Sequence, residues 1–116
     1  MTPAVAYKII DVAEWREAVA EGAYAGSAVD LADGYIHFST ALQVRETAHR
    51  HFTGQPDLML VGVDPAKLGD ALKWEPSRGG QLFPHLYGPL PMTAVLFAEP
   101  LPVDAAGYHV FPASIR

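Results

Sequence analysis

Two short segments of the chain place imidazole groups beside hydroxyl or phenol groups, and these side chains could carry out chemistry. The first segment, residues 34–40 (GYIHFST), contains His37 followed by Ser39 and Thr40. The second, residues 83–89 (FPHLYGP), contains His85 and Tyr87 between prolines, which limit the entropy lost when a ligand orders a loop. Histidine is the commonest side chain for proton transfer or metal binding near neutral pH. The two segments together form our candidate site.

Each of these groups also has a purely structural interpretation. A single histidine on a strand can simply be satisfied by hydrogen bonds, and the segment with His85 and Tyr87 could be an aromatic plug that closes the end of a sheet. Thr40 and Gln43 have the spacing of a helix capping box. The same helix start would present free N–H groups to a phosphate or carboxylate. The sequence leaves both interpretations open.

Glu75 lies upstream of the second segment, and it allows three groupings with the histidines. These are a metal site of His37, His85 and Glu75, a histidine–carboxylate acid–base pair, and a polar nucleotide pocket. The metal site lacks a recognisable ligand spacing, since His49 and His51 are two residues apart on a predicted helix and so diverge. There is no serine-hydrolase elbow, phosphate-binding glycine loop or dinucleotide fingerprint.

Length and composition set the outer limits of function. We expect one domain over residues 1–116, because the chain has 116 residues and half of them are hydrophobic. The net charge of −5 argues against binding to duplex nucleic acid, and the absence of cysteine excludes disulfides and cysteine-ligated metal centres. No signal-type segment or membrane-length apolar run occurs, so we expect a cytoplasmic protein.

Hydrophobic periodicity and capping residues predict the elements that position these groups. About five to six strands are expected, and the almost unbroken apolar run 58–63 is expected to be the central one. Five of them have the ranges 5–10, 35–39, 58–63, 71–75 and 92–98. A helix should begin at Asp11 and end at Gly22, with Val12, Trp15 and Val19 as its buried stripe, and a second helix should span 41–51.

The remaining segments are predicted to be connections. Residues 23–33 are small and end in turn chemistry at Asp33-Gly34. Residues 76–91 hold four prolines and three glycines among sixteen residues, which predicts a long ordered loop or a lid. The proline-rich tail after Glu99 is expected to be a terminal strand or an extended segment. On strand 35–39, alternation should point Tyr35, His37 and Ser39 to one face and Ile36 and Phe38 to the other.

With these motifs in place, the chain resembles the bacterial domain-of-unknown-function family 952 over nearly its whole length. The two histidine motifs together make the resemblance specific. It rests on residues 7–10 (YKII), Trp15, 33–40 (DGYIHFST), Gln43, 64–65 (DP), Glu75 and 83–88 (FPHLYG).

This resemblance implies a compact α+β domain similar to the ADP-ribosyltransferase fold, with a bent, split sheet of about five to six strands, two main helices and a cleft for NAD or an ADP-ribose-like ligand. In such transferases a His on the first core strand holds the ribose, an aromatic residue on the second stacks on nicotinamide, and a later Glu assists transfer. Here the first strand offers Tyr7 and Lys8, and the second carries His37, which is similar to the RNA 2'-phosphotransferase relatives. Glu75 is available as the later carboxylate.

Our leading hypothesis is a protein that binds a nucleotide-like or phosphorylated small molecule, with NAD as a substrate and a transferase as the enzymatic version. His37 or His85 would position the ribose or move a proton, Tyr87 would stack or donate, and Glu75 would stabilise developing positive charge. The expected ligand-binding residues are Tyr35, Ser39, Thr40, Gln43 and Gly88. Two alternatives remain, namely a non-catalytic binding or interaction module with structural histidines and a histidine–carboxylate metal enzyme.

Overall fold

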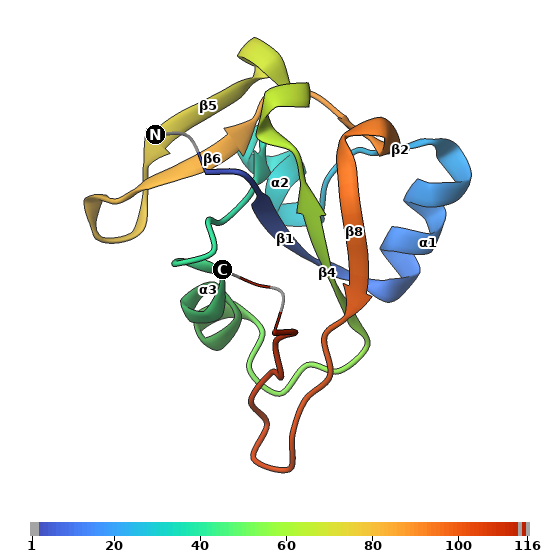
Figure 1. Cartoon of the computed structure of the whole chain (residues 1–116), viewed down its shortest axis with the longest axis vertical. Coiled ribbons are helices and arrows are strands. Elements are labelled where there is room, and N and C mark those ends of the chain that lie inside the picture. Colours follow the sequence, from blue (N-terminus) through green and yellow to red (C-terminus); the bar gives the residue numbers. More distant parts are fainter. Residues whose placement is uncertain (1–2, 114, 116) are drawn as a thin grey trace.

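A three-stranded antiparallel sheet forms the centre of the computed structural model, which describes residues 3–113 and 115. Its strands are β1 (Ala6–Asp11), β4 (Leu58–Val63) and β8 (Val95–Pro100), in the order β1-β4-β8 (Figure 1). β4 is buried along most of its length and pairs on both edges. The prediction of a central strand at 58–63 is therefore confirmed.

A second antiparallel sheet carries both histidine segments. Its order is β3-β6-β5, formed by β3 (Ile36–His37), β6 (Leu82–Leu86) and β5 (Leu72–Pro76). β5 and β6 lie side by side above the central sheet in Figure 1. A two-stranded sheet of β2 (Ala23–Tyr24) and β7 (Leu90–Pro91) completes the pairing.

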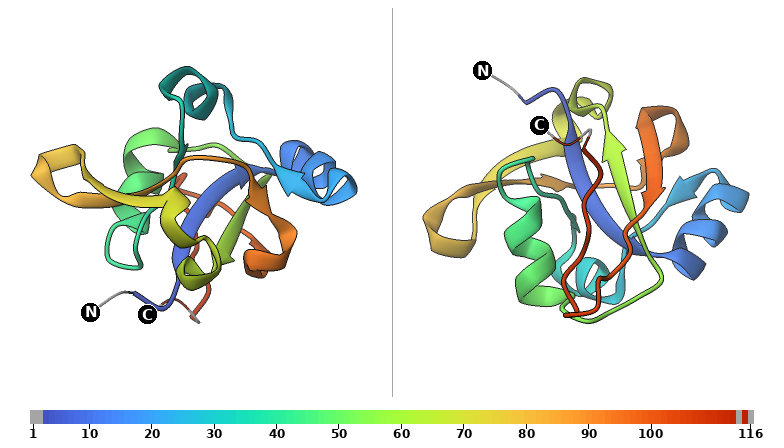
Figure 2. Two further views of the ribbon diagram at one scale, coloured as in Figure 1. Left: turned by 90° about the horizontal axis from the view of Figure 1, so that it is seen from above. Right: turned by 60° about the horizontal axis from the view of Figure 1, so that its bottom comes forward.

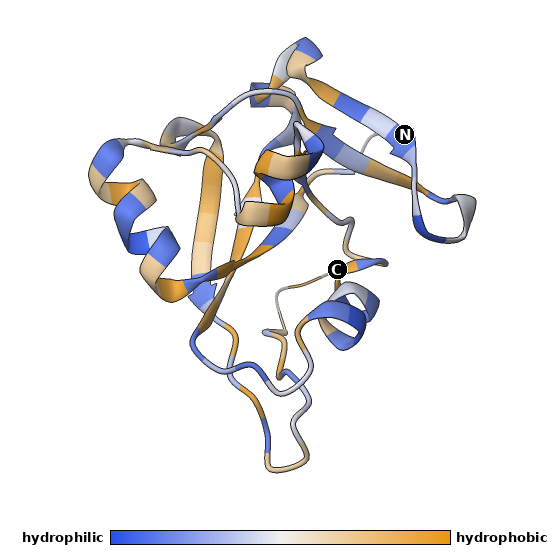
Figure 3. Cartoon of the chain, turned by 180° about the vertical axis from the view of Figure 1, so that it is seen from behind, coloured by the Kyte–Doolittle hydropathy of each residue, from blue (hydrophilic) through white to orange (hydrophobic). Residues whose placement is uncertain are grey.

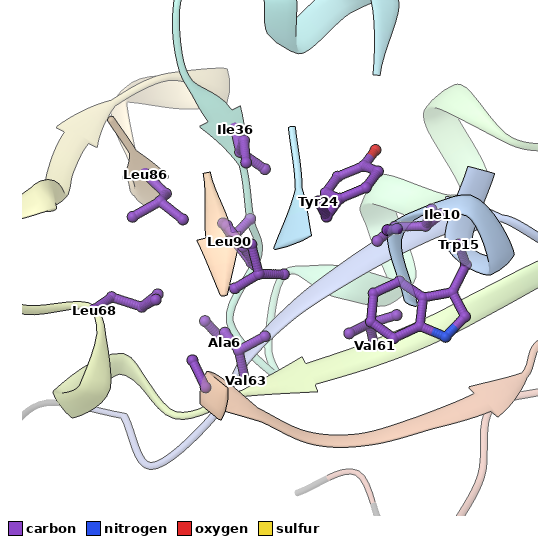
Figure 4. Close-up of a cluster of buried hydrophobic side chains, with 13 residues drawn as sticks. Ala6, Ile10, Trp15, Tyr24, Ile36, Val61, Val63, Leu68, Leu86 and Leu90 are labelled. Carbon is purple, nitrogen blue, oxygen red and sulfur yellow. The ribbon is translucent and has the colours of Figure 1, made fainter. Parts of the chain in front are cut away.

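The main hydrophobic core lies between the central sheet and the second sheet. Figure 4 shows apolar side chains of β1 and β4, such as Ala6 and Val63, on one side and those of β3, β6 and β7, such as Ile36, Leu86 and Leu90, on the other. These side chains are almost completely buried. Burial of this apolar area is the dominant favourable term that holds the second sheet in place.

A second core covers the opposite face of the central sheet. There, Tyr7 and Leu60 pack against Val44 and Ala48 of α3 (Val44–His51). They also pack against Leu101 of the C-terminal segment, which follows β8 and comprises residues 101–113 and 115. Figure 2 shows α3 in green and the C-terminal segment in red beside β1. α3 is mostly hydrophilic on its outer side (Figure 3). The alternation of β1 thus serves both cores, because successive side chains point to opposite faces.

Helix α1 (Val12–Glu21) begins and ends where its capping residues predict. The carboxylate of Asp11 accepts hydrogen bonds from the N–H groups of the first turn, and Gly22 closes the helix with a positive φ of 87°. The predicted buried stripe was partly wrong. Trp15 is buried, but its partner is Ala18, whereas Val19 is 54% exposed. Because α1 covers the edge of the core, only a narrow stripe of it is buried.

The segment 23–33 is not a plain connection, which corrects the sequence prediction. It forms β2 and then helix α2 (Ala28–Asp33). Ser27 and Asp30 form a complete capping box, and Gly34 ends the helix with a φ of 89°. Six residues give little periodicity, so the capping box was the only local indication of this helix.

The prediction of a loop or lid at 76–91 is also wrong, because this segment contains β6, the middle strand of the second sheet. Pro84 is tolerated there because in an antiparallel ladder the N–H and C=O of one residue point to the same neighbour. The carbonyl of Pro84 accepts the N–H of Phe38, just beyond the last residue of β3. An N–H at residue 84 would point to the same neighbour, Phe38, which lies beyond the end of β3. Its absence therefore removes no hydrogen bond from the ladder between β3 and β6.

The α+β class is confirmed, but the element count is higher than predicted. The described residues form eight short strands and three α-helices, with α3 beginning at Val44 and not at residue 41. Four 3₁₀ turns connect the strands: η1 (Pro65–Lys67), η2 (Gly69–Ala71), η3 (Arg78–Gly80) and η4 (Met92–Ala94). η4 replaces the first half of the strand predicted at 92–98. No helix among the described residues has the length and apolar character needed to cross a membrane.

Gly62 on β4 leaves room for the ring of Phe97 on β8, and we predict that Gly62→Ala destabilises the fold. A Cβ atom at residue 62 would overlap with that ring. The expected loss is about 1–3 kcal/mol in the free energy of unfolding, as for other overpacked cores. Urea titration measures it. In a double-mutant cycle, Phe97→Leu should recover part of the loss, and full additivity of the two changes would contradict this explanation.

Candidate functional site

His37 lies between two carboxylates that come from the same helix. Its Nδ1 is 2.6 Å from Asp30 Oδ1, and its Nε2 is 2.9 Å from Asp33 Oδ2. A carboxylate oxygen only accepts hydrogen bonds, so the doubly protonated ring matches both contacts. The Asp30 side chain is 2% exposed and that of Asp33 is 47% exposed. One carboxylate is therefore an internal anchor and the other a surface contact.

The carboxylate of Asp30 on α2 contacts several donors next to the second sheet. It accepts the N–H of His37 at 3.1 Å and that of Ser27 at 2.8 Å, and it contacts the buried Lys8 ammonium at 3.2 Å. Burial alone would raise the pKa of Asp30, but the hydrogen bond from His37, the charge of Lys8 and the two backbone N–H groups outweigh it. The net pKa of Asp30 lies well below its usual range. Asp30 is therefore an ionised anchor for the imidazole.

Lys8 completes this anchor from the central sheet. Besides Asp30, its ammonium donates to the carbonyl of His37 at 3.0 Å. Burial lowers the pKa of Lys8, and the charge of Asp30 only partly compensates. The ion pair thus joins β1, α2 and β3 at one point beneath the histidine.

A second imidazole–carboxylate pair lies on β5 and β6. Glu75 Oε1 accepts hydrogen bonds from His85 Nδ1 and from the Tyr87 hydroxyl, both at 2.8 Å. These two bonds, from His85 first and Tyr87 second, lower the pKa of Glu75. The bond to Glu75 also raises the pKa of Tyr87 to about 12. His85 is 3% exposed and Tyr87 is 43% exposed, so this pair leads from the interior to the surface.

Tyr35 joins the two pairs through ring contacts. Its ring centroid is 4.2 Å from that of His85 in a stacked arrangement, 4.6 Å from His37 and 5.2 Å from Tyr87. The two imidazole centroids are 5.5 Å apart. We call this set the imidazole–carboxylate cluster; it consists of Asp30, Asp33, Tyr35, His37, Glu75, His85 and Tyr87.

The register of the second sheet brings the two sequence segments together. His37 on β3 is directly paired with His85 on β6, which is paired with Lys73 on β5. Paired residues point to the same face, so the three side chains form a row across the sheet. The next pair, Ile36 and Leu86, points into the core. The cluster therefore occupies the outer face of the sheet whose inner face is the core.

A cleft of about 280 Å³ lies beside the cluster, and we call it the Tyr35 cleft. Tyr35 and Asp30 line it together with apolar residues and Gly88. Its other lining residues are Ala25, Leu31, Gly34, Ile36, Leu86 and Pro89. The cleft and the cluster share Tyr35 and Asp30, whereas the two histidines and Tyr87 do not line the cleft.

The structure divides the predicted site residues into two groups. His37, His85, Glu75, Tyr87 and Tyr35 lie in the cluster, and Gly88 lines the adjoining cleft.

Ser39, Thr40 and Gln43 belong to a different network. The hydroxyl of Ser39 bonds to Thr47 on α3 at 2.9 Å. Gln43 caps the N–H of Thr40 and donates to the carbonyl of Leu82. Ser39 therefore does not share a contact with His37, because β3 ends after His37 and the chain turns to pair with β1.

Sequence reasoning missed the two carboxylates that hold His37. Asp33 was interpreted only as a turn residue, and Asp30 was not considered. The capping-box spacing of Ser27 and Asp30 would have revealed the short helix, but not that the Asp30 carboxylate points to Lys8 and His37. Among residues 3–113 and 115, no three His, Asp or Glu side chains are grouped so as to hold a metal ion.

Comparison with family models places this arrangement within a known family. The model described as "Protein of unknown function (DUF952)" matches residues 9–98, which include every residue of the cluster. The chain belongs to this family. No curated protein matches the chain significantly.

Solved structures of one relative have the same fold. The crystal structure of protein CC0527 from Caulobacter crescentus is 50% identical and has a TM-score of 0.88, with 91% of this chain and 93% of that chain covered. A crystal structure of a double mutant of that protein gives 48% identity with the same coverage and TM-score. Its solution NMR structure gives 50% identity, a TM-score of 0.82 and 90% coverage of both chains.

We predict that Asp30→Asn strongly destabilises the protein. The change leaves the buried Lys8 ammonium without its counter-charge, and removal of one partner of a buried ion pair costs about 3–5 kcal/mol. Chemical denaturation at pH 7 measures the loss. The matched control is Asp33→Asn on the same helix, which removes an exposed carboxylate and should cost about 1 kcal/mol or less. Equal losses for the two variants would contradict the anchoring role of Asp30.

The same anchor predicts that the free energy of unfolding of the wild-type protein decreases at acid pH. Because the pKa of Asp30 is lower in the folded than in the unfolded state, its contribution is fully present above the ordinary carboxyl pKa of about 4. It is lost as the pH falls below that value toward the depressed folded pKa. Asp30→Asn should therefore flatten the stability profile below about pH 4.

The second pair predicts a shift in a phenol titration. Glu75→Gln replaces the carboxylate whose hydrogen bond, and to a smaller extent whose charge, raises the pKa of Tyr87 to about 12, so this pKa should fall toward its ordinary value of about 10. Ultraviolet absorbance between pH 9 and 13 follows the ionisation, and subtraction of the Tyr87→Phe titration isolates Tyr87. An unchanged Tyr87 titration in Glu75→Gln would show that the hydrogen bond does not form in solution.

Proposed function

We propose that this protein binds a nucleotide-like ligand of the NAD or ADP-ribose type at the imidazole–carboxylate cluster and the Tyr35 cleft. The observation that carries the proposal is the pairing of two imidazole–carboxylate units across β3 and β6, joined by Tyr35 at the edge of a cleft. Side by side at the edge of a cleft, the two units supply the few convergent polar groups that fix the orientation of a ligand.

The chemical groups of the site match the parts of such a ligand. The half-exposed rings of Tyr35 and Tyr87 and the apolar walls of the cleft offer surfaces on which a base can stack. The carboxylate of Glu75 can accept a hydrogen bond from a ribose hydroxyl. His37, whose side chain is 31% exposed, can donate to a phosphate or ring oxygen.

A ligand oxygen can bind to His37 Nε2 only when the Asp33 carboxylate moves away from that nitrogen. Asp33 is the exposed partner of the imidazole, whereas Asp30 is buried and holds the opposite nitrogen. When a ligand oxygen replaces the Asp33 carboxylate, both ring nitrogens of His37 still have a hydrogen-bond acceptor. Asp33 therefore competes with the ligand in this proposal, and Asp30 positions the ring for both.

The resemblance to ADP-ribosyltransferases extends the proposal to group transfer. In that reaction the bond between ribose C1' and nicotinamide breaks, nicotinamide leaves as a neutral base, and an acceptor oxygen or nitrogen bonds to C1'. Glu75 would stabilise the positive charge that develops on the ribose and would take the acceptor proton. His85 is 3% exposed, so its part is to position Glu75.

The burial of His85 also favours a second candidate function. In a non-catalytic binding module the histidines hold the sheet together, and the stacked Tyr35–His85 pair and the Glu75 bond give His85 such a role. The module would bind its ligand at the same face without group transfer.

Calorimetry with ADP-ribose and NAD tests the proposal. We expect saturable binding of the wild-type protein, and His37→Asn should weaken it about tenfold or more, because a hydrogen bond to a charged group contributes about 1.5–3 kcal/mol. Asp33→Asn should strengthen binding, since it removes the competing carboxylate. A chromatographic assay of nicotinamide released from NAD distinguishes the transferase from the binding module.

The matched control is His51→Asn on α3, which changes an exposed histidine outside the cluster and should leave the affinity unchanged. Thermal unfolding of each variant verifies that it is folded. The proposal fails if neither ligand produces heat at millimolar concentration, or if His37→Asn and His51→Asn bind equally well.

A further inference from the structure

A second cleft of about 280 Å³ lies on the other side of the central sheet, between α3 and the C-terminal segment, and we call it the α3 cleft. Arg45 and His49 line it from the helix, and Tyr108, His109 and Phe111 line it from the C-terminal segment. Of the residues that the structure describes, none lines both this cleft and the Tyr35 cleft. Figure 1 shows α3 beside the C-terminal segment, below the second sheet that carries the cluster.

The walls of the α3 cleft are aromatic. The ring of His49 stacks on that of Tyr108, with centroids 5.7 Å apart and planes inclined by 19°. The guanidinium of Arg45 lies 5.1 Å from the centroid of Phe111. Tyr108 is 54% exposed although it is a large aromatic side chain. Flat rings at an open cleft are surfaces on which a planar ligand can stack.

The polar groups of this cleft are cationic or hydrogen-bond donors. Arg45 has no ion pair with any described residue, because the nearby Glu46 pairs with Arg50 at 2.8 Å and with Arg78 at 3.6 Å. His109 Nε2 donates to the carbonyl of Gln55 at 2.9 Å. Among residues 3–113 and 115, no carboxylate lines the cleft. A guanidinium that has no ion pair within the described part of the chain, beside two imidazoles, favours an anion, although the net charge of the chain is −5.

The loop that forms one wall is held in place before any ligand arrives. The carboxylate of Asp104 accepts the N–H groups of Ala106 and Tyr108, and the carbonyl of Gly107 accepts the N–H of Gly54 at 3.1 Å. A residue of the loop, Val103, also pairs with His109. Because the backbone is fixed at both sides, a ligand has little ordering entropy to overcome.

From these observations we infer that the α3 cleft is a binding site for a small planar anion, an aromatic ring that carries a carboxylate or phosphate group. The ring stacks against Tyr108 and His49, and the anionic group lies against Arg45. This inference is independent of the function proposed for the imidazole–carboxylate cluster, because it rests on other residues on the other side of the central sheet.

NMR titration of the ¹⁵N-labelled protein tests the site with four probes. AMP and 4-hydroxybenzoate are aromatic anions, adenosine is an uncharged aromatic compound, and inorganic phosphate is an anion without a ring. We expect saturable shifts at Arg45, His49 and the 107–111 amides with both aromatic anions, and binding about tenfold weaker or more with adenosine and phosphate. Equal binding of phosphate or of adenosine would overturn the assignment of a planar anion.

Arg45→Gln should weaken the binding of both aromatic anions about tenfold. Tyr108→Ala should also weaken their binding, although the charge of Arg45 is kept. The matched control Arg16→Gln removes an exposed arginine from α1 and should leave binding unchanged. His37→Asn should also leave shifts in the α3 cleft unchanged, whatever it does at the cluster. The inference is wrong if Arg45→Gln binds like the wild-type protein, or if the shifts occur only at residues of the cluster.

Discussion

The buried carboxylate of Asp30 is the interaction on which the candidate site depends. It receives two backbone N–H groups, one imidazole N–H and one ammonium, and these donors come from the start of α2, from β3 and from β1. A carboxylate that is 2% exposed is tolerated only when its charge and its lone pairs are matched in this way. Through its contacts with Lys8 of β1 and His37 of β3, Asp30 links the central sheet to the second sheet. Stability and the orientation of His37 are therefore consequences of one network.

The two imidazole–carboxylate units differ in a way that suits different roles. In the first, the carboxylate is buried and the imidazole reaches the surface, so His37 can meet a ligand while Asp30 holds it. In the second, the imidazole is buried and the carboxylate is half-exposed, so Glu75 can meet a ligand while His85 holds it. Tyr35 lies in contact with both imidazole rings and so packs between the two units. The outer face of the second sheet thus presents the imidazole of His37 and the carboxylate of Glu75, and each is positioned by a buried partner.

Much of the fold could be predicted from local sequence, and the exceptions have physical reasons. Asp11 and Gly22 mark the ends of α1, and the apolar run of β4 identifies the central strand, because caps and burial patterns are local. β6 was missed because Pro84 excludes most strands, and only the end of the β3 ladder beside it removes the need for an N–H. α2 was missed because six residues are too few for periodicity. Ser39 was expected beside His37, but the chain leaves the sheet after His37.

The sequence by itself determined which groups are available: two histidines in restrained segments, Glu75 and Tyr87 near the second, and Tyr35 two residues before the first. Only the tertiary structure decided that His37 and His85 are directly paired, that Asp30 and Lys8 lie beneath them, and that Ser39 bonds to Thr47 of α3 instead. The physical reason is the strand register. A shift of one residue between β3 and β6 would turn His37 into the core and Ile36 to the surface, so the burial of Ile36 and Leu86 against the central sheet selects the pairing that assembles the site.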